Sequence, residues 1–265
     1  MSSSLIDEDS FYERFFHRGQ YGLSGGWPHS TTLLYRMRIK KAGKNNIKKN
    51  RLLHKSGCSS LPQCERWTKV ENDAGGRHAE MLFVQQVNEL LDCLNEEESQ
   101  QTYRQISFDI VLSYSPCSDC AKELTQLKRR SIEPTPSGYN VIFCTMNIKF
   151  AKFYEHYVFE NIEAMIWMVQ NQIEFSVFNG LCDWKDFLDN IVKLALDIQS
   201  EAFYATWFYR QDRELVDSIL LECIKLTAFK WPTQDNEGRE EMKKRICDLK
   251  SAKSSFAYLM DLRAF

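Results

Sequence analysis

The expected fold is decided by two short runs, Gly76-Arg77-His78-Ala79-Glu80 and Pro116-Cys117-Ser118-Asp119-Cys120. Each run leads into a segment with the pattern of a helix, and residues 103–113 between them alternate as a strand does. The order is therefore helix, strand, helix, with a histidine at the first helix start and two cysteines at the second. We expect the two helix N-termini to converge on one site.

His78, Cys117 and Cys120 have the residue types and the spacing of zinc ligands. Zinc binds His nitrogen and Cys sulfur, and a catalytic zinc site has three protein ligands and an open position for water. The Cys-x-x-Cys spacing places both sulfurs on one side of the first helical turn, where the helix dipole and the free amides favour thiolates. Glu80 follows the histidine by two residues, so its carboxylate can face the open position without binding the metal. We expect one catalytic zinc ion here.

The whole pattern, His-x-Glu followed by Pro-Cys-x-x-Cys, is the signature of zinc-dependent nucleobase deaminases. Zinc lowers the pKa of water toward about 7, and Glu80 is expected to take the proton, protonate ring N3 and assist the departure of ammonia. The alternative is a structural zinc module closed by a fourth ligand. No further cysteine lies in a second half-site, and we interpret the following as free thiols: Cys58, Cys64, Cys93 and Cys144.

The flanking segments complete an α/β pattern. Further strands are expected over residues 31–41, 47–54, 139–146 and 173–178, with a turn at 43–46 and a long loop over 57–76. Further helices are expected over residues 118–130, 160–172 and 183–196. This gives a five-stranded mixed sheet flanked by about six helices. Residues 196–265 have a helical pattern broken at 231–233, so we expect a catalytic domain over 1–195 and a helical C-terminal extension packed on or continuing it.

The composition is that of a soluble globular protein, with 43% hydrophobic and 26% charged residues. No apolar run approaches the roughly 18 to 20 residues of a membrane helix, and residues 1–10 lack the apolar core of a secretory signal. We therefore expect an intracellular protein of the cytoplasm or nucleus with no membrane partner. Its nine cysteines are then thiols or metal ligands rather than disulfides. The aromatic content of 13% predicts either extra core or a base-stacking surface.

The net charge of −2 conceals a basic block within residues 31–55. The block has nine Lys or Arg and no acid, so the other 25 of the 34 basic residues balance against all 36 acids. A local block can follow a phosphate backbone, because the Debye length is about 8 Å at physiological salt. The alternative is a solvated lysine-rich hairpin. The candidate contacts to a nucleic-acid backbone are Arg36, Arg38, Lys40, Lys41, Lys48, Lys49 and Lys55.

The run Gly76-Arg77-His78-Ala79-Glu80 and the run Ser113-Tyr114-Ser115-Pro116-Cys117 resemble the AID/APOBEC family of polynucleotide cytidine deaminases. Tyr114 stands where the family has Trp. Residues 29–35 are similar to its first loop and opening strand, and residues 178–188 to a strand-to-helix segment. The resemblance covers about residues 10–195. It implies a cytidine-deaminase-like fold and a target cytosine in single-stranded DNA or RNA, as in mutator enzymes that edit DNA in immunity.

Matching by position, the resemblance also implies substrate contacts. They are Tyr114, which would line the cytosine pocket, and Thr31, His29, Ala79 and Ser113. The alternatives are a core residue for Tyr114 and a surface loop for His29. Residues 147–160 stand where the family has its specificity loop, and the candidates for base stacking there, with core packing as the alternative, are Phe150, Phe153 and Tyr154. The asparagine that the family commonly places after its second strand corresponds to Lys55.

Two other functions compete with this prediction. The first is a deaminase of free nucleosides or of adenosine in tRNA, against which the basic block and the Ser113-Tyr114-Ser115 run argue. The second is a catalytically silent zinc fold that binds nucleic acid. Glu80 argues against the second, because a binding module needs the metal site but has no use for a proton carrier.

Overall fold

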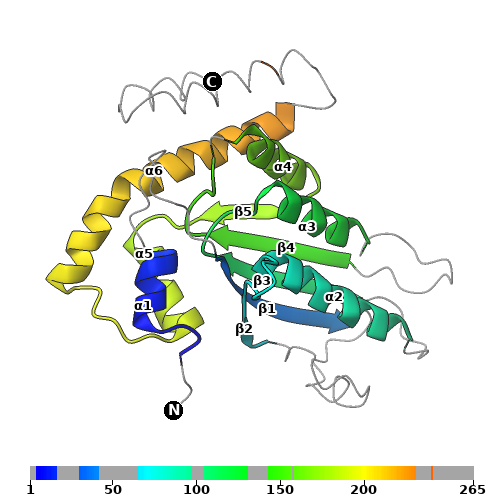
Figure 1. Ribbon diagram of the computed structural model, residues 1–265, viewed down its shortest axis with the longest axis horizontal. Coiled ribbons are helices and arrows are strands. Elements are labelled where there is room, and N and C mark those ends of the chain that lie inside the picture. Colours follow the sequence, from blue (N-terminus) through cyan, green and yellow to red (C-terminus); the bar gives the residue numbers. More distant parts are fainter. Residues whose placement is uncertain are drawn as a thin grey trace.

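The computed structural model describes residues 4–16, 30–41, 65–96, 104–130, 143–156, 158–230 and 240. Its centre is a five-stranded mixed sheet in the order β2-β1-β3-β4-β5 (Figure 1). The strands are β1 (Thr32–Lys41), β2 (Trp67–Glu71), β3 (Arg104–Leu112), β4 (Phe143–Phe150) and β5 (Glu174–Val177). β1 is antiparallel to β2 and β3, whereas β3, β4 and β5 are parallel. The expected α/β fold with a five-stranded mixed sheet is confirmed.

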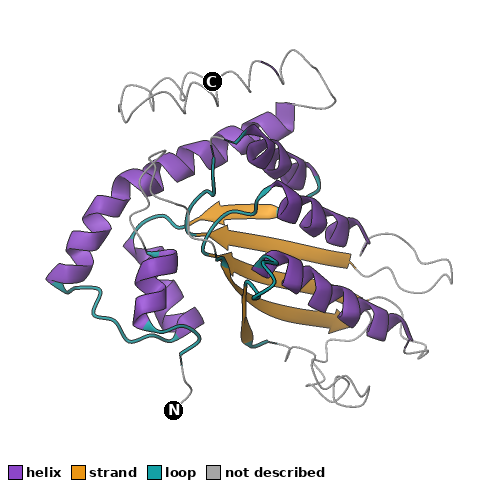
Figure 2. Cartoon of the chain, in the orientation of Figure 1, coloured by secondary structure: helices purple, strands orange, loops and turns teal. Residues whose placement is uncertain are grey.

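Helices cover both faces of this sheet (Figure 2). One face packs against α2 (Ala79–Glu96), α3 (Ser118–Arg130) and α4 (Phe159–Gln170). Part of the other face packs against the π-helical turn η1 (Phe11–Phe15), which directly follows α1 (Glu8–Ser10), and against α5 (Leu181–Asp186) with η2 (Phe187–Val192). The long helix α6 (Glu201–Lys230) lies against α4 and the edge strand β5. These are six α-helices within the described part of the chain.

The alternation along β1 separates two cores. Successive side chains of a strand point to opposite faces. Leu33, Tyr35 and Met37 enter the main core beneath α2 and α3. Leu34 enters a second core on the opposite face, which is built mainly of aromatic side chains from η1, α5 and η2. The second core brings the N-terminal residues to α5, where Trp184 is fully buried.

The structure has a strand, β2, within a segment for which the sequence predicts a loop. Trp67–Glu71 forms β2 and pairs with residues 32–36 of β1. The expectation of a loop throughout 57–76 is therefore wrong for these residues. β2 is a short edge strand in which only Val70 is buried, so its hydrophobic signal is weak. The predicted strand over 47–54 lies outside the described residues.

β4 continues to Phe150, four residues beyond the predicted end at Met146. Met146, Ile148 and Phe150 are all buried in the main core, while the polar side chains between them belong to the other face. The first residues of the predicted specificity loop are therefore strand. Their alternation with Asn147 and Lys149 conceals the strand in the sequence, because an uninterrupted apolar run is the usual sign of a central parallel strand.

α6 shares its packing with the rest of the fold. Leu220, Leu221 and Ile224 lie in the main core, and Phe203 lies in the second core. Residues 231–239 and 241–265 are outside the described part of the chain. No helix among the described residues is both long and apolar enough to span a bilayer.

Candidate metal centre and active site

A tight turn, closed by one aspartate, positions His78 at the start of α2. Asp73 accepts the backbone N–H of Arg77 (2.9 Å) and the Nε–H of the same residue (2.7 Å). Gly76 has a φ of +81°, a left-handed conformation that glycine adopts without steric cost. The carbonyl of His78 then accepts the N–H groups of Met81 (3.0 Å) and Leu82 (3.2 Å) as the helix begins. The histidine is thereby fixed at the helix N-terminus.

The two cysteines stand at the start of α3. The carbonyl of Cys117 accepts the N–H of Ala121 (2.9 Å), and Cys120 lies in the first helical turn. Asn161 of α4 is buried, and its Oδ1 accepts the N–H of Ser118 (2.9 Å). This asparagine supplies the cap that the first turn of a helix needs, so α4 fixes the direction in which α3 points its N-terminus.

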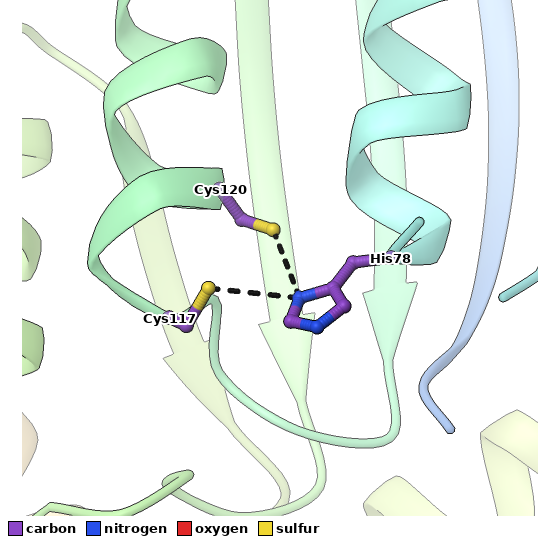
Figure 3. Close-up of side chains that lie close together, drawn as sticks. All are labelled: His78, Cys117 and Cys120. Atoms are coloured by element: carbon purple, nitrogen blue, oxygen red, sulfur yellow. Dashed lines mark hydrogen bonds between the residues drawn. The ribbon is translucent and has the colours of Figure 1, made fainter. Parts of the chain in front are cut away.

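The histidine and both cysteines lie together (Figure 3). Nδ1 of His78 is 3.3 Å from Sγ of Cys120 and 3.6 Å from Sγ of Cys117. Zinc bonds of about 2.3 Å to sulfur and about 2.0 Å to nitrogen, at a tetrahedral angle, separate the two ligand atoms by about 3.6 Å. The three ligand atoms all lie within 4.8 Å of one another. They therefore stand at the separations that one shared metal ion requires.

The two thiols shift each other's pKa in opposite directions. The thiol of Cys120 donates to Cys117, which lowers the pKa of Cys117 to about 5. The pKa of Cys120 is raised because it is the donor, and burial acts in the same direction. A metal ion replaces the protons of its thiol ligands when it binds. This pair is therefore suited to a soft cation such as zinc.

Glu80 is buried beside the ligand group. Its side chain is 2% exposed, and within the described residues Oε2 has no hydrogen-bond partner. Burial raises the pKa of Glu80 to about 7, with the neighbouring charge of Cys117 acting in the same direction. A carboxyl group with a pKa near neutrality can both accept and donate a proton.

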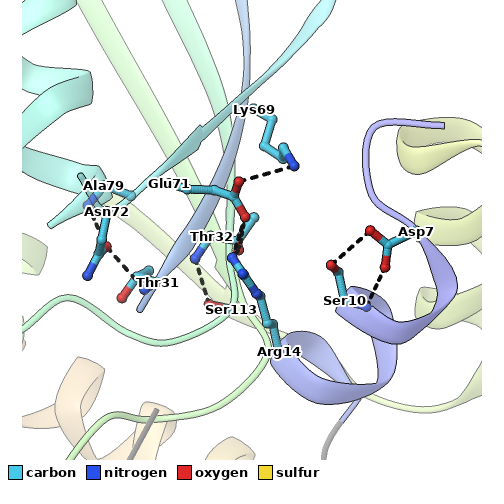
Figure 4. A network of polar contacts seen from close by, with 10 residues as sticks. All are labelled: Asp7, Ser10, Arg14, Thr31, Thr32, Lys69, Glu71, Asn72, Ala79 and Ser113. Atoms are coloured by element: carbon cyan, nitrogen blue, oxygen red, sulfur yellow. Dashed lines mark hydrogen bonds and ion pairs between the residues drawn. The ribbon is translucent and has the colours of Figure 1, made fainter. Parts of the chain in front are cut away.

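The predicted substrate residues Thr31, Ala79 and Ser113 lie where β1, α2 and β3 meet (Figure 4). Oδ1 of Asn72 accepts the N–H of Thr31 (3.1 Å) and the N–H of Ala79 (3.0 Å). Oγ of Ser113 accepts the N–H of Thr32 (3.0 Å), whose carbonyl accepts the N–H of Ser113. Asn72 thus joins the first strand to the first residue of α2.

Two residues of this network, Asn72 and Arg14, are not predicted from the sequence. Asn72 directly follows β2, whereas Lys55 lies outside the described residues. Arg14 of η1 donates to Oγ1 of Thr32 (2.9 Å) and forms an ion pair with Glu71 (Figure 4). A correct position for β2 would have identified Asn72. No local pattern identifies Arg14, because its partners are distant in sequence.

Tyr114 is buried, with 3% of its surface exposed, and precedes Cys117 by three residues. Nζ of Lys152 lies 4.7 Å from the centre of its ring, and the ring of Tyr154 meets it edge to face at 6.3 Å. Burial raises the pKa of the Tyr114 hydroxyl. Tyr154 is half-buried, so it stays a candidate for base stacking.

Phe150 and Phe153 belong to the main core. Phe150 is fully buried and Phe153 is 1% exposed, and their rings meet edge to face at 4.8 Å. Such burial leaves no ring face for a base. The interpretation of these two residues as base-stacking groups is therefore wrong, and the packing alternative holds. Their sequence position was misleading because β4 extends farther than its pattern indicates.

The basic residues of β1 lie away from His78, Cys117 and Cys120. Arg36 and Arg38 lie on the opposite face of the sheet, where both pair with Asp109 at 2.9 and 2.6 Å. β1 also runs away from the site, because Lys41 pairs with Arg104 at the start of β3 while the cysteines follow its end. At about 3.3 Å per residue, the far end of β1 lies about 30 Å from Thr32. Lys40 and Lys41 are at that far end, while the remaining predicted contacts lie outside the described residues: Lys48, Lys49, Lys55 and His29.

A hollow of about 460 Å³ lies on this same far face of the sheet. Arg36, Trp67, Asp109 and Lys149 are among the residues that line it. Arg36 stacks on Trp67, with its Cζ 5.0 Å from the ring centre, and Lys149 pairs with Asp183 at 2.8 Å. The charged side chains of Arg36 and Lys149, which line the hollow, therefore already have partners within the protein.

No protein-family model matches the chain, and no curated protein matches it.

Proposed function

We propose that this chain is a zinc-dependent enzyme with a cytidine-deaminase-like fold that converts cytosine to uracil in single-stranded DNA or RNA. The observation that carries the proposal is the buried Glu80 carboxylate, one oxygen of which has no hydrogen-bond partner among the described residues, two positions after the candidate ligand His78. A buried polar atom without a partner costs free energy. In a purely structural zinc site nothing offsets this cost, whereas a site that transfers protons requires a buried carboxylate of this kind.

The three-ligand group favours catalysis over a closed structural site. Within the described residues, no fourth His, Cys, Asp or Glu joins His78, Cys117 and Cys120. Cys144 lies instead in the main core on β4. A bound zinc ion would supply Lewis acidity and lower the pKa of water in its open position.

Glu80 moves the protons of the reaction. Its carboxylate takes a proton from the attacking water and delivers it to ring N3, so that C4 of cytosine accepts the new C–O bond. It then carries the second water proton to the amino nitrogen, and the C–N bond breaks as ammonia departs. One water is consumed, and uracil and ammonia are the products. No oxidant or reductant is needed.

Tyr154 is the group that we assign to base stacking, and its half-buried ring meets that of the buried Tyr114 edge to face at 6.3 Å. Their edge-to-face contact lies next to the loop that carries Cys117. Base stacking on aromatic rings contributes about 1 to 3 kcal/mol per base. A base must leave its stack to reach a buried carboxylate, which favours a single strand over a duplex as substrate.

The proposal is tested with a panel of four substrates. Zinc-loaded protein is incubated with single-stranded DNA, single-stranded RNA, free cytidine and tRNA, and uracil or inosine formation is measured by sequencing or chromatography. We expect uracil in a single-stranded polynucleotide and none from free cytidine. Conversion of free cytidine or of tRNA adenosine alone would establish the other deaminase class. A zinc-loaded protein that converts nothing would establish the silent zinc fold.

A further inference from the structure

Helix α6 places four buried charged side chains against the segment that follows β4. Arg210, Arg213, Glu214 and Asp217 are between 0% and 4% exposed. They form two pairs one helical turn apart, with Arg210 Nε 3.2 Å from Glu214 and Arg213 Nε 2.9 Å from Asp217. Buried ion pairs are a weak source of stability because both charges lose their hydration. Their other contacts therefore indicate what they do.

Both arginines donate to the backbone of residues 151–154. Nη2 of Arg210 donates to the carbonyl of Ala151 (2.6 Å), and Nη2 of Arg213 donates to the carbonyl of Phe153 (2.7 Å). Oδ1 of Asp217 accepts the N–H of Phe153 (3.4 Å). The side chains of α6 thus bind two alternate residues, Ala151 and Phe153, on one side of the irregular segment that follows β4.

The other edge of the same segment holds the loop that carries a metal ligand. The carbonyl of Lys152 accepts the N–H of Ser115 (2.9 Å), and the N–H of Tyr154 donates to Oγ of Ser115 (2.9 Å). Ser115 lies between Tyr114 and Cys117. Residues 151–154 therefore connect α6 to the part of the site that we assign to the base.

We propose that Arg213 and Asp217 are positioning residues for the base-binding side of the site. They hold residues 151–154 in register, and these in turn fix Tyr114, Ser115 and Tyr154. The inference rests on the proposed deaminase function. The metal ligands have other anchors, since Asn161 caps α3 and the turn at Asp73 fixes His78. Loss of the pair should therefore move the base and leave the metal in place.

The test compares a charge-free variant with a matched control. Arg213→Met combined with Asp217→Leu removes both charges, so that neither is left buried alone. The control is Ile224→Ala, which opens the main core on the same helix. Arg213→Lys is a milder variant that retains the charge but not the planar fork of donors. Four measurements are made: steady-state kinetics (kcat and KM) on a single-stranded substrate, absorption of the cobalt(II)-loaded protein, backbone hydrogen exchange, and the Tm.

We expect the double variant to lower kcat by about 100-fold, the scale of a small misplacement of a reacting group. The cobalt(II) spectrum should not change. Amide exchange over residues 113–117 and 151–156 should become at least about tenfold faster as this segment opens locally. Arg213→Lys should show both effects to a smaller extent. Ile224→Ala should lower the Tm and keep kcat within about twofold at temperatures well below that Tm.

Unchanged amide exchange in the double variant over residues 113–117 and 151–156 would overturn the proposal. An equal loss of kcat in Ile224→Ala, compared at matched stability, would overturn it too. The exchange experiment does not depend on catalysis. If the wild-type chain deaminates nothing, the proposed function fails, and exchange in the double variant or in Arg213→Lys still decides whether α6 holds the loop.

Discussion

Two polar clusters lie on opposite faces of the same sheet and differ in how their charges are paired. In the Asp109 cluster, Oδ2 accepts from Arg36 and Arg38, and Oδ1 accepts from Asn147 (3.2 Å). In the site group of His78, Glu80, Cys117 and Cys120, the three candidate ligand atoms lie within 4.8 Å of one another, and one oxygen of Glu80 has no hydrogen-bond partner in the described part of the chain. Buried polar groups are normally satisfied. The exception is therefore the feature that points to chemistry.

The difference also shows how little a cluster of charges says by itself. The sequence marks the arginines of β1 as candidate phosphate contacts, yet both share one carboxylate far from the site. The side chain of Arg38 is 44% exposed, so its ion pair is weakened by solvent. The site group has fewer formal charges and is more buried. Each of its charges therefore interacts more strongly with its neighbours.

The largest effect that distinguishes the two clusters is expected for Glu80→Gln. The amide retains the shape of the side chain but cannot carry a proton, so deamination should fall by about 1,000-fold or more. Zinc content and Tm should stay close to those of the wild type, because Glu80 is not a ligand. Rate assays on single-stranded DNA together with metal analysis measure both quantities. A Glu80→Gln chain that deaminates at a comparable rate would remove the assigned mechanism.

The remaining lysines of the basic block test whether phosphate binding is separate from the Asp109 cluster. Replacement of Lys40, Lys41, Lys48 and Lys49 by Ala should weaken binding to single-stranded DNA by about tenfold at physiological salt. Each lost phosphate contact should also reduce the slope of log K against log salt by about 0.7. Fluorescence anisotropy across a salt series measures both. An unchanged affinity and slope would exclude these lysines from the interface.

Asp109→Ala should affect stability but not chemistry. It removes the shared acceptor of two arginines and an asparagine, at a cost of about 1 kcal/mol for a partly exposed cluster. Denaturant unfolding measures this change, and kcat should stay within about twofold of the wild type, as expected for a site on the other face. A loss of kcat comparable to that of Glu80→Gln would mean that the two faces are coupled.

The smallest effect is expected for Arg36→Ala. Its guanidinium stacks on Trp67 and shares Asp109 with Arg38, which stays in place to neutralise the carboxylate. We expect a loss of about 0.5 kcal/mol in the free energy of unfolding. Affinity for single-stranded DNA should change by less than about twofold, because this arginine already has its partner. A tenfold loss of affinity would show that the paired face binds nucleic acid.

Local patterns in the sequence were sufficient for much of the site. The metal ligands and Glu80 stand at helix starts, and helix starts have short-range signals. The strand between them has a regular alternation, so the expectation that His78, Cys117 and Cys120 come together needed no knowledge of distant contacts. The main strands β1 and β3 were predictable for the same reason.

The features of the fold and the site that the sequence did not predict depend on pairing between distant residues. β2 is defined by its partner β1 rather than by its own composition, and Asn72 could not be placed without it. The contact of Arg213 with Phe153 joins α6 to the end of β4, which no periodicity indicates. Phe150 and Phe153 look like loop aromatics in sequence and are core in the structure, because their burial is decided by neighbouring strands and helices.

The most direct test of the central claim is a titration of metal-free protein with cobalt(II), followed by absorption spectroscopy. Cobalt(II) occupies sites with zinc-like ligands and makes them visible. We predict that one ion binds per chain, with the intense absorption of a tetrahedral site and sulfur-to-metal charge-transfer bands that weaken in Cys117→Ala and in Cys120→Ala and disappear when both cysteines are replaced. A chain that binds no cobalt(II), or whose spectrum shows only a weak octahedral site indifferent to these substitutions, would contradict the account.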